Sequence, residues 1–542
     1  MSSHIVAESY LGSRYEEVRR WAEMDPDPES REQLLQILKS ALLGDLEEVL
    51  SSFAQPLVFG TAGLRGPIGI GPGRFNVCLV ARLARALVAW LEDRGLPGPV
   101  VIGFDARHKS REAAHAAAAQ FAAAGLEVLV QSAPRPTPAL AFAARELGAS
   151  VALMVTASHN PGTDNGVKIY GPDARQIIPP VDVEIAAHLA AVDSLLPPSS
   201  TWRVLDESLF DRYVESCVSL ATSPAPLRSH VVIAHTAMHG VALSALTPVF
   251  ARAGFSFRTV PAQADPDPDF PTVSFPNPEE PGAMDQLLAL AAEISADVAM
   301  ANDPDADRLA AAVRAADGSY RVLTGDELGA VFLWARAATD RVSGTVANTI
   351  VSSELLGHVC QGYGLKYETT LTGFKWLSHV KDLGYACEES IGYCLDPDHV
   401  RDKDGISAAL VLADLIAAGL DPLDVLEKLD RRYGAHVQAN FSLRTSPEQT
   451  ASLLESLLSG ETLPTLLEAP RLSTEDLSKH PSQPTNGIRL RFKGDSFTAR
   501  LLMRPSGTEP KTKVYLEVVH ADRTTAISLA TRARLEIETA LG

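Results

Sequence analysis

The order of apolar and polar positions changes along the chain and divides it into regions of different predicted structure. Up to about Phe53, apolar and charged residues alternate at helical spacing, which predicts helices. From about Val58, short apolar runs alternate with long helical stretches, a pattern typical of βαβ units and a mainly parallel sheet. The alanine-rich stretch 112–124 predicts a packed helix rather than a disordered tract.

This strand-and-helix pattern occurs three times before a different pattern replaces it. A proline and serine cluster at 197–200 predicts a linker, after which the pattern restarts at 230–235 and again at 344–350. Beyond Tyr433 the sequence predicts strands of an antiparallel sheet, at 441–444, 487–492, 499–503 and 514–518.

The predicted fold class is therefore α/β, with three similar βαβ-type domains built on mainly parallel or mixed sheets around a central cleft. A smaller C-terminal α+β domain with an antiparallel sheet follows them. The expected domains are 1–200 with the helical lead-in, 201–320, 321–435 and 436–542. In open α/β sheets the functional loops lie at the carboxyl ends of the strands, so polar residues just past predicted strands are the first candidates for chemistry.

Composition narrows the classes of function. The 542 residues are 46% hydrophobic and 21% charged, and no stretch reaches the roughly 18 consecutive apolar residues that cross a bilayer. The N-terminus lacks the features of a secretory signal, so we expect a cytoplasmic protein with no membrane partner. The formal net charge of −19 argues against nucleic acid as a partner. The five cysteines form no C-x-x-C pair and are expected to be reduced packing residues.

Thr156-Ala-Ser-His-Asn-Pro161 follows a predicted strand and presents a serine hydroxyl among polar groups. A hydroxyl is a weak nucleophile, and a phosphorylated serine needs its negative charge compensated. His159, Asn160 and Lys168 are nearby donors that can do so. An ordinary turn is the alternative, but the density of polar groups at a strand end favours a serine that carries a phosphoryl group.

Asp303, Asp305 and Asp307 occupy alternate positions, so in an extended segment all three carboxylates would point the same way. Only a cation makes this concentration of negative charge tolerable, and oxygen ligands favour Mg²⁺ before Mn²⁺ or Ca²⁺. An EF-hand loop opens with the same pattern. It requires glycine at its sixth position and glutamate at its twelfth, where this chain has Arg308 and Arg314. A solvated acidic turn stays open as the alternative.

Three later segments carry further polar candidates. Arg504-Pro-Ser-Gly-Thr-Glu-Pro510 offers a guanidinium, hydroxyls and backbone N–H groups, which can grip a phosphate without a metal, although it can also be an ordinary hairpin. Glu388 and Ser390 are suited to a pair of sugar hydroxyls. The charged segment from Asp398 to Gly405 is either functional or a solvated helix cap.

Six segments together, in this order, resemble the α-D-phosphohexomutases, and within them the phosphoglucomutase and phosphopentomutase branch. The resemblance covers roughly Gln55 to Val519. The matching segments are Gly60 to Gly66, Thr156 to Tyr170, Asp303 to Arg308, Thr372 to Trp376, Glu388 to Ser390, and Arg504 to Pro510. It implies an intramolecular phosphotransferase of the isomerase class.

The resemblance also implies a role for each matching residue. Ser158 would be the phosphoserine, and with Asp303, Asp305 and Asp307 it would hold one Mg²⁺ per chain. His159, Lys168 and Arg65 would assist catalysis, with Lys168 a candidate for the proton transfers. The residues implied in substrate binding are Arg308, Thr372, Gly373, Lys375, Glu388, Ser390, His399 and Lys403. The residues implied in binding the phosphate that is not reacting are Arg504, Ser506, Gly507 and Thr508.

In the mechanism that the resemblance implies, phosphoserine donates to the free hydroxyl of glucose 1-phosphate. The bisphosphate then turns end over end and returns its other phosphate to Ser158, so glucose 1,6-bisphosphate should activate the enzyme. Closure of the fourth domain would exclude water.

The chain departs from the family pattern at two places. Ala62 stands where many members have serine, a change expected to be mild. Ile391-Gly392 stand where phosphomannomutase-type members have Gly-His, which makes mannose a less favoured substrate. The missing histidine leaves His399 and Lys403 as candidates for the second acid or base.

The leading hypothesis is a phosphoglucomutase that is a monomer or dimer and acts on a small-molecule phosphosugar. Alternatives within the family are a phosphopentomutase acting on ribose or deoxyribose 1-phosphate, and then a phosphomannomutase. Outside the family, a phosphatase would release inorganic phosphate. A catalytically silent sugar-phosphate-binding protein is also possible in principle, but the intact Ser158 and carboxylates count against it.

Overall fold

The computed structural model describes residues 2–60, 63–480, 483–506 and 511–541. They form two compact units, the first made of Met1–Val322 and Gly392–Ala418, the second of Leu323–Ile391 and Gly419–Gly542. The segment Gly392–Ala418, expected in the third domain, thus packs with the first unit.

The first unit begins with helices and then builds a mixed sheet, as the sequence predicts. The lead-in helices are α1 (Ser2–Met24), α2 (Pro28–Leu42) and α3 (Glu47–Phe53). The sheet has the order β1 (Phe59–Gly60), β2 (Gly63–Pro67), β6 (Asp164–Tyr170), β5 (Val151–Val155), β3 (Val100–Phe104), β4 (Val128–Val130) and β7 (Arg203–Val204). Strands β5, β3, β4 and β7 are parallel, whereas β6 and β2 run antiparallel to their neighbours.

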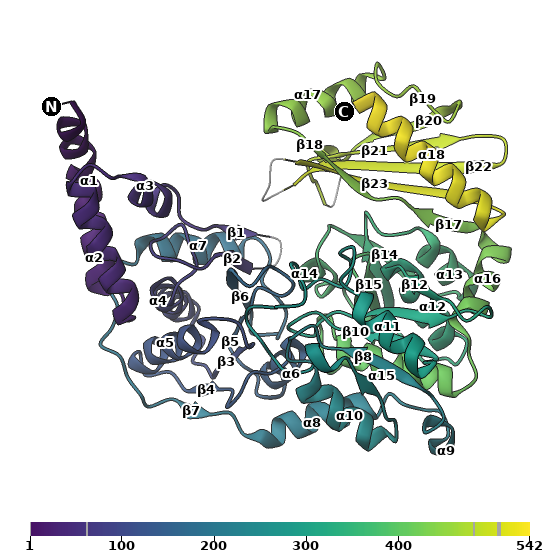
Figure 1. The fold of residues 1–542 in the computed structure, drawn as a ribbon, viewed down its shortest axis with the longest axis horizontal. Coiled ribbons are helices and arrows are strands. Elements are labelled where there is room, and N and C mark those ends of the chain that lie inside the picture. Colours follow the sequence, from purple (N-terminus) through teal and green to yellow (C-terminus); the bar gives the residue numbers. More distant parts are fainter. Residues whose placement is uncertain (1, 61–62, 481–482, 507–510, 542) are drawn as a thin grey trace. The chain divides into compact units, whose positions relative to one another are not determined.

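Helices cover this sheet and complete its core. They are α4 (Val77–Arg94), α5 (Ser110–Ala123), α6 (Thr137–Glu146) and α7 (Val181–Ala191). The alanine-rich stretch is α5, and its small side chains allow it to pack closely beside α4 (Figure 1). The apolar residues of β3, β4 and β5 are buried against these two helices, which fixes the carboxyl ends of the strands.

A second sheet in the same unit has the order β12 (Tyr320–Leu323), β11 (Ala310–Arg314), β10 (Val298–Ala301), β8 (Ile233–Thr236) and β9 (Arg258–Thr259). Strands β10, β8 and β9 are parallel, and β11 is antiparallel to β10. The remaining elements are α8 (Glu207–Val218), α9 (Ala225–Arg228), α10 (Leu243–Ala253), η1 (Pro261–Gln263), α11 (Asp285–Ile294), β16 (Gly392–Cys394) and α15 (Gly405–Ala417). The acidic loop with Asp303 leaves the carboxyl end of β10.

The second unit contains a parallel sheet and an antiparallel sheet. The parallel strands are β14 (Lys366–Thr370), β13 (Thr345–Thr349) and β15 (Leu383–Glu388), and the nearby helices are α12 (Gly325–Ala337), α13 (Leu355–Tyr363), α14 (Phe374–Leu377) and α16 (Pro422–Tyr433). A capping box between Thr324 and Glu327 starts α12.

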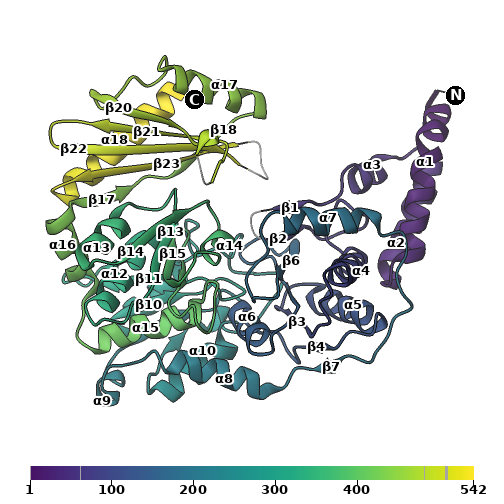
Figure 2. The same ribbon diagram turned by 180° about the vertical axis from the view of Figure 1, so that it is seen from behind.

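The antiparallel sheet has the order β17 (Ala435–Gln438), β23 (Lys511–His520), β22 (Phe497–Pro505), β21 (Ile488–Lys493), β20 (Ala469–Asp476) and β19 (Thr465–Leu466). Strand β18 (Phe441–Arg444) also pairs with β23. Helix α18 (Arg523–Leu541) packs its apolar residues against this sheet (Figure 2), α17 (Pro447–Ser459) contributes to the same core, and η2 (Leu477–Lys479) follows β20. The predicted fold class of three α/β domains and a C-terminal antiparallel domain is confirmed.

Within the described ranges, no single helix is both long enough and apolar enough to cross a membrane; only α15 and α16 taken together pass on length and composition. The five cysteines are all free and buried.

Candidate active site

Ser158 lies in the loop that follows β5, at the carboxyl end of the strand. Its backbone has a φ of 55°, in the left-handed region that few non-glycine residues adopt. The Thr156 hydroxyl accepts a hydrogen bond from the Ser158 N–H at 2.9 Å and helps to hold this turn. The buried Ser158 hydroxyl donates to Asp303 Oδ2 at 2.9 Å and lies 3.2 Å from His159 Nδ1. The structure thus brings together two loops that are 145 positions apart in the sequence.

Arg107, a buried residue that the sequence did not single out, binds the backbone of the serine loop. The Arg107 guanidinium donates to the carbonyl oxygens of Ser158 and Asn160, each at 2.6 Å, and to that of Pro161 at 2.8 Å. Asp105 lies 3.4 Å from its Nε, and the ring of Phe270 lies 4.9 Å from its centre. The signal that could have revealed Arg107 is its place just past β3, beside β5 in the sheet.

The three aspartates form a turn, and the prediction that they lie in an extended segment is wrong. Ala306 has a φ of 56°, and the Ala306 N–H donates to the Asp303 carbonyl. The three side chains are nevertheless fully buried and converge, with one carboxylate oxygen from each within 4.8 Å of the others. The turn therefore gathers the carboxylates that strand geometry was expected to align. Ser158, Lys168, Asp303, Asp305 and Asp307 are called the carboxylate centre below.

In two of these carboxylates, protein groups hydrogen-bond one oxygen and leave the other without a partner in the described ranges. Lys168 Nζ donates to Asp305 Oδ2 at 2.6 Å and to Asp307 Oδ2 at 2.5 Å. Thr137, the first residue of α6, also donates its hydroxyl to Asp305 Oδ2 at 2.6 Å. Oδ1 of Asp305 and Oδ1 of Asp307 are buried and have no hydrogen-bond partner within the described part of the chain. Buried oxygens left without partners are the ligands that a hard cation such as Mg²⁺ takes, so the residues fit the ion.

Electrostatics support the same conclusion. Burial and the two neighbouring carboxylates raise the pKa of Asp303 well above its ordinary value. Burial would also raise the pKa of Asp305, but Lys168 and the Thr137 hydrogen bond hold it below its usual range. Burial would lower the pKa of Lys168, but Asp305 and Asp307 raise it. Burial and mutual repulsion thus disfavour three ionised carboxylates side by side, and a bound cation would relieve this repulsion.

Other cationic side chains surround the carboxylate centre. Arg308 Nε lies 4.0 Å from both Asp303 and Asp307, and Lys403 Nζ lies 3.3 Å from Asp307 Oδ2. Burial lowers the pKa of Arg65, while Asp305 and Asp307 raise it. Burial and the nearby arginines lower the pKa of His159 well below its ordinary value. Of the sequence candidates in this unit, Arg65, Arg308, Lys403 and His159 thus lie around the centre.

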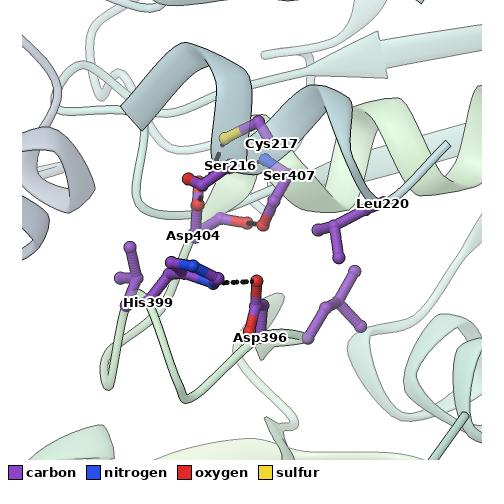
Figure 3. Close-up of a pocket in the computed structure, with 9 residues that line it drawn as sticks. Ser216, Cys217, Leu220, Asp396, His399, Asp404 and Ser407 are labelled. Atoms are coloured by element: carbon purple, nitrogen blue, oxygen red, sulfur yellow. Dashed lines mark hydrogen bonds and ion pairs between the residues drawn. The ribbon is translucent and has the colours of Figure 1, made fainter. Parts of the chain in front are cut away.

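His399 lies in a separate small pocket. Its Nδ1 pairs with Asp396 Oδ2 at 2.6 Å (Figure 3), and its ring stacks on that of Phe142. Cys217 and Asp404 also line this pocket, which has a volume of about 10 Å³. Of the two candidates for a second acid or base, Lys403 and not His399 contacts the carboxylate centre.

In the second unit, the loops after β14 and β15 carry the predicted sugar-binding residues. Thr372 Oγ1 is buried and has no hydrogen-bond partner among the residues that the structure describes, and Gly373 has a φ of 110° that favours glycine. Lys375 Nζ lies 6.0 Å from the ring of Trp376. Glu388 is buried at the end of β15, and Ser390 Oγ lies 3.5 Å from Glu389 Oε1. Thr372–Lys375 and Glu388–Ser390 are called the recognition loops below.

Arg504 and Ser506 stand at the end of β22, where the predicted phosphate loop begins. The Ser506 N–H donates to the Lys511 carbonyl at 2.8 Å. Gly507 and Thr508, predicted in the same loop, lie outside the described residues, as does Ala62.

Comparison with known proteins gives a consistent assignment. Family descriptions named phosphoglucomutase/phosphomannomutase, alpha/beta/alpha domains I, II and III, match residues 56–195, 211–318 and 324–433. A probable phosphomannomutase of Haemophilus influenzae is 38% identical over 82% of this chain and 92% of its own length. A phosphopentomutase of Homo sapiens is 33% identical over 93% of this chain and 91% of its own.

Solved structures agree on the fold. The crystal structure of a putative phosphomannomutase from Thermus thermophilus superposes with a TM-score of 0.72 at 24% identity, covering 89% of this chain and 99% of that one. With the family descriptions across three domains and relatives above 30% identity over most of the chain, the protein belongs to the phosphoglucomutase/phosphomannomutase family of α-D-phosphohexomutases, which are phosphotransferring mutases.

Proposed function

We propose that the protein interconverts glucose 1-phosphate and glucose 6-phosphate through a phosphoserine at Ser158 and a glucose 1,6-bisphosphate intermediate. The observation that carries this proposal is the 2.9 Å contact between Ser158 Oγ and Asp303 Oδ2, in a buried centre with two orphaned carboxylate oxygens. A serine placed against a site suited to a divalent cation can accept and release a phosphoryl group.

In the first half-reaction, the bond between phosphorus and Ser158 Oγ breaks and a bond from phosphorus to the free sugar hydroxyl forms. The attacking hydroxyl loses its proton and the departing Ser158 Oγ gains one, so that in net terms one proton passes from the sugar oxygen to the serine oxygen. The second half-reaction runs in reverse on the other phosphate of the bisphosphate. Arg65, Arg308 and Lys403 supply positive charge for the transferring group.

Mg²⁺ would be held by Asp303, Asp305 and Asp307 with an oxygen of the phosphoserine, one ion per chain, and would stabilise negative charge on the transferring group. We propose a supporting role for Lys168 in this scheme, because it donates to Oδ2 of two aspartates, whose Oδ1 atoms would then be available to the ion.

We assign sugar recognition to the second unit. Thr372, Lys375, Glu388 and Ser390 are proposed to read the sugar hydroxyls, and the orphaned Thr372 hydroxyl supports this role because a buried hydroxyl without a partner can be satisfied by a ligand. Arg504 and Ser506, with Gly507 and Thr508, are proposed to hold the phosphate that is not reacting.

A second candidate substrate is a pentose 1-phosphate. It is favoured by relatives named phosphoribomutase in Saccharomyces cerevisiae, 32% identical over 94% of this chain, and phosphopentomutase in Homo sapiens. We further propose a cytoplasmic protein that acts as a monomer or dimer on small phosphosugars.

The test is a set of initial-rate assays of the purified protein with Mg²⁺ and a catalytic amount of glucose 1,6-bisphosphate. We expect the highest kcat/KM with glucose 1-phosphate, compared with mannose, ribose and deoxyribose 1-phosphates. A higher value with the pentose phosphates would replace glucose by the second candidate. Release of inorganic phosphate in place of an isomerised sugar phosphate would contradict the mutase function.

A further inference from the structure

The turn between β15 and β16 contains a strained residue next to a candidate sugar ligand. Ile391 directly follows Ser390, is buried, and has a φ of 53°, which is a genuine outlier for a β-branched side chain. Gly325, at the start of α12, approaches so closely that a Cβ there would lie 2.3 Å from the Glu389 carbonyl oxygen and 2.7 Å from the Ile391 nitrogen. Strain of this kind persists only where the surrounding structure enforces it.

The carboxylate of Glu389 supplies part of that enforcement. Its Oε2 accepts hydrogen bonds from Thr349 Oγ1 at 2.8 Å and from Ser352 Oγ at 2.7 Å, and its backbone N–H donates to Ser352 Oγ at 3.3 Å. Its other oxygen, Oε1, faces the Ser390 hydroxyl at 3.5 Å. Glu389 thus stands between two proposed sugar ligands, and its carboxylate is held by the protein.

The loop that holds Glu389 is also attached to the strand that carries Arg504. Arg500 donates from Nη2 to the Ser352 carbonyl at 2.5 Å and from Nη1 to the Ile350 carbonyl at 3.3 Å. Its buried guanidinium also lies 3.2 Å from Glu517 Oε2. Because side chains alternate along a strand, Arg500 and Arg504 share one face of β22.

We propose that Glu389 is a positioning residue for sugar recognition and that the chain Glu389–Ser352–Arg500 fixes the spacing between the turn at Ser390 and the strand at Arg504. This inference rests on the proposed function. Glucose phosphates have a six-membered ring and ribose phosphates a five-membered ring, so the distance from C1 to the distal phosphate differs between them, and a fixed spacing selects one of them. Loosening it reduces the selection more than it reduces stability.

The experiment compares Glu389→Ala, Ser352→Ala and the double variant with wild type, using glucose 1-phosphate and ribose 1-phosphate. We expect each single variant to lose roughly 10- to 100-fold in kcat/KM for the preferred sugar, because a displacement of about 1 Å at a reacting or binding group has costs of this size. The preference between the two sugars should fall toward unity, and the double variant should lose much less than the product of the single losses. Glu368→Ala, an exposed glutamate on β14, is the matched control and should retain the wild-type preference.

Glu389→Gln keeps an oxygen that can accept from Thr349 and Ser352, so it should restore most of the preference between the two sugars. A merely structural defect would not show this recovery. An unchanged sugar preference in Glu389→Ala, in a wild type that is active, overturns the inference and leaves the proposed function intact. If wild type isomerises none of the sugar phosphates, the proposed function fails. In that case, calorimetry measures the affinities of wild type and of each variant for glucose 6-phosphate and ribose 5-phosphate. A ratio of these two affinities that is the same in wild type and Glu389→Ala would overturn the positioning role. Should Glu389→Ala fail to fold, Ser352→Ala and Glu389→Gln carry the test.

Discussion

The carboxylate centre of the first unit and the recognition loops of the second unit are built in different ways. Ser158, Lys168 and the aspartates of the centre are almost fully buried, and protein groups fix most of their polar atoms. In the recognition loops, Thr372, Lys375 and Ser390 are half-buried, and the Thr372 hydroxyl has no protein partner. The side chains proposed to transfer the phosphoryl group are therefore held in place before the substrate binds. In the recognition loops, by contrast, polar atoms remain for the substrate to hydrogen-bond. Substitutions in the first region should therefore reduce kcat, and those in the second should raise KM.

The largest effect is expected for Ser158→Ala. If the serine carries the phosphoryl group, its loss removes the covalent intermediate, and kcat should fall by roughly 10⁴-fold or more. Mass spectrometry of protein treated with glucose 1,6-bisphosphate should show phosphate on wild type and none on the variant. Ser199→Ala, in the exposed linker, is the control. Equal rates for Ser158→Ala and wild type would remove the basis of the contrast between the regions.

Substitution of Arg107 tests whether the hydrogen bonds of this side chain preorganise the serine loop. Lysine keeps the positive charge beside Asp105, but its single nitrogen cannot reproduce the fork of two nitrogens from which Arg107 donates to the carbonyls of Ser158, Asn160, Pro161 and Asp164. We expect Arg107→Lys to lower kcat about 10²-fold with little change in KM. Arg111→Lys, on the exposed face of α5, is the matched control. A rise in KM without a fall in kcat would assign Arg107 to recognition.

Substitution of Thr137 tests the proposed metal site. The Thr137 hydroxyl donates to Asp305 Oδ2 and so orients a carboxylate that would hold the cation, and Thr137→Ala should therefore weaken Mn²⁺ or Mg²⁺ binding by roughly 10- to 100-fold. Titration calorimetry of the purified protein measures this without turnover. Thr137→Ser keeps the hydroxyl and should restore the affinity. Identical affinities in wild type and Thr137→Ala would show that Lys168 alone orients the carboxylate.

Thr372→Val should change stability and substrate binding in opposite directions. Removing a buried hydroxyl without a partner should stabilise the protein by about 1 kcal/mol, whereas the lost contact to substrate should raise KM about 10-fold. Thr370→Val is the contrast, because Thr370 Oγ1 donates to the Leu371 carbonyl and its loss should destabilise. Chemical unfolding and steady-state kinetics measure the two effects. A destabilised Thr372→Val with unchanged KM would mean that the hydroxyl serves the fold.

The sequence predicted the polar residues of the carboxylate centre better than it predicted their arrangement. Local spacing identified Ser158 and the three aspartates, but the turn at Ala306 depends on how β10 continues into β11, which spacing does not reveal. Arg107 and Thr137 were missed because their role comes from contacts with residues 51 and 168 positions away. His399 and Lys403 are four residues apart and belong to the same polar segment of the sequence. Only tertiary packing places one beside Asp307 and the other beside Phe142.

The smallest expected effect concerns Asp404, whose side chain caps α15 and so bears on stability, although its neighbour Lys403 contacts the carboxylate centre. Burial raises the pKa of Asp404 to about 6, although hydrogen bonds from the Ile406 and Ser407 N–H groups and from Tyr213 oppose the shift. Because the folded pKa exceeds the unfolded value of 3.8, the folded state binds the proton more tightly, and this stabilisation is lost as pH rises from about 4 through 6. Asp404→Asn cannot titrate, so its free energy of unfolding relative to wild type should rise by about 1 kcal/mol between pH 5 and pH 8. Urea unfolding at both pH values measures the difference. If the difference in free energy of unfolding between Asp404→Asn and wild type is constant across that range, Asp404 titrates below pH 5. A change in KM in Asp404→Asn would show that this helix cap affects the recognition loops.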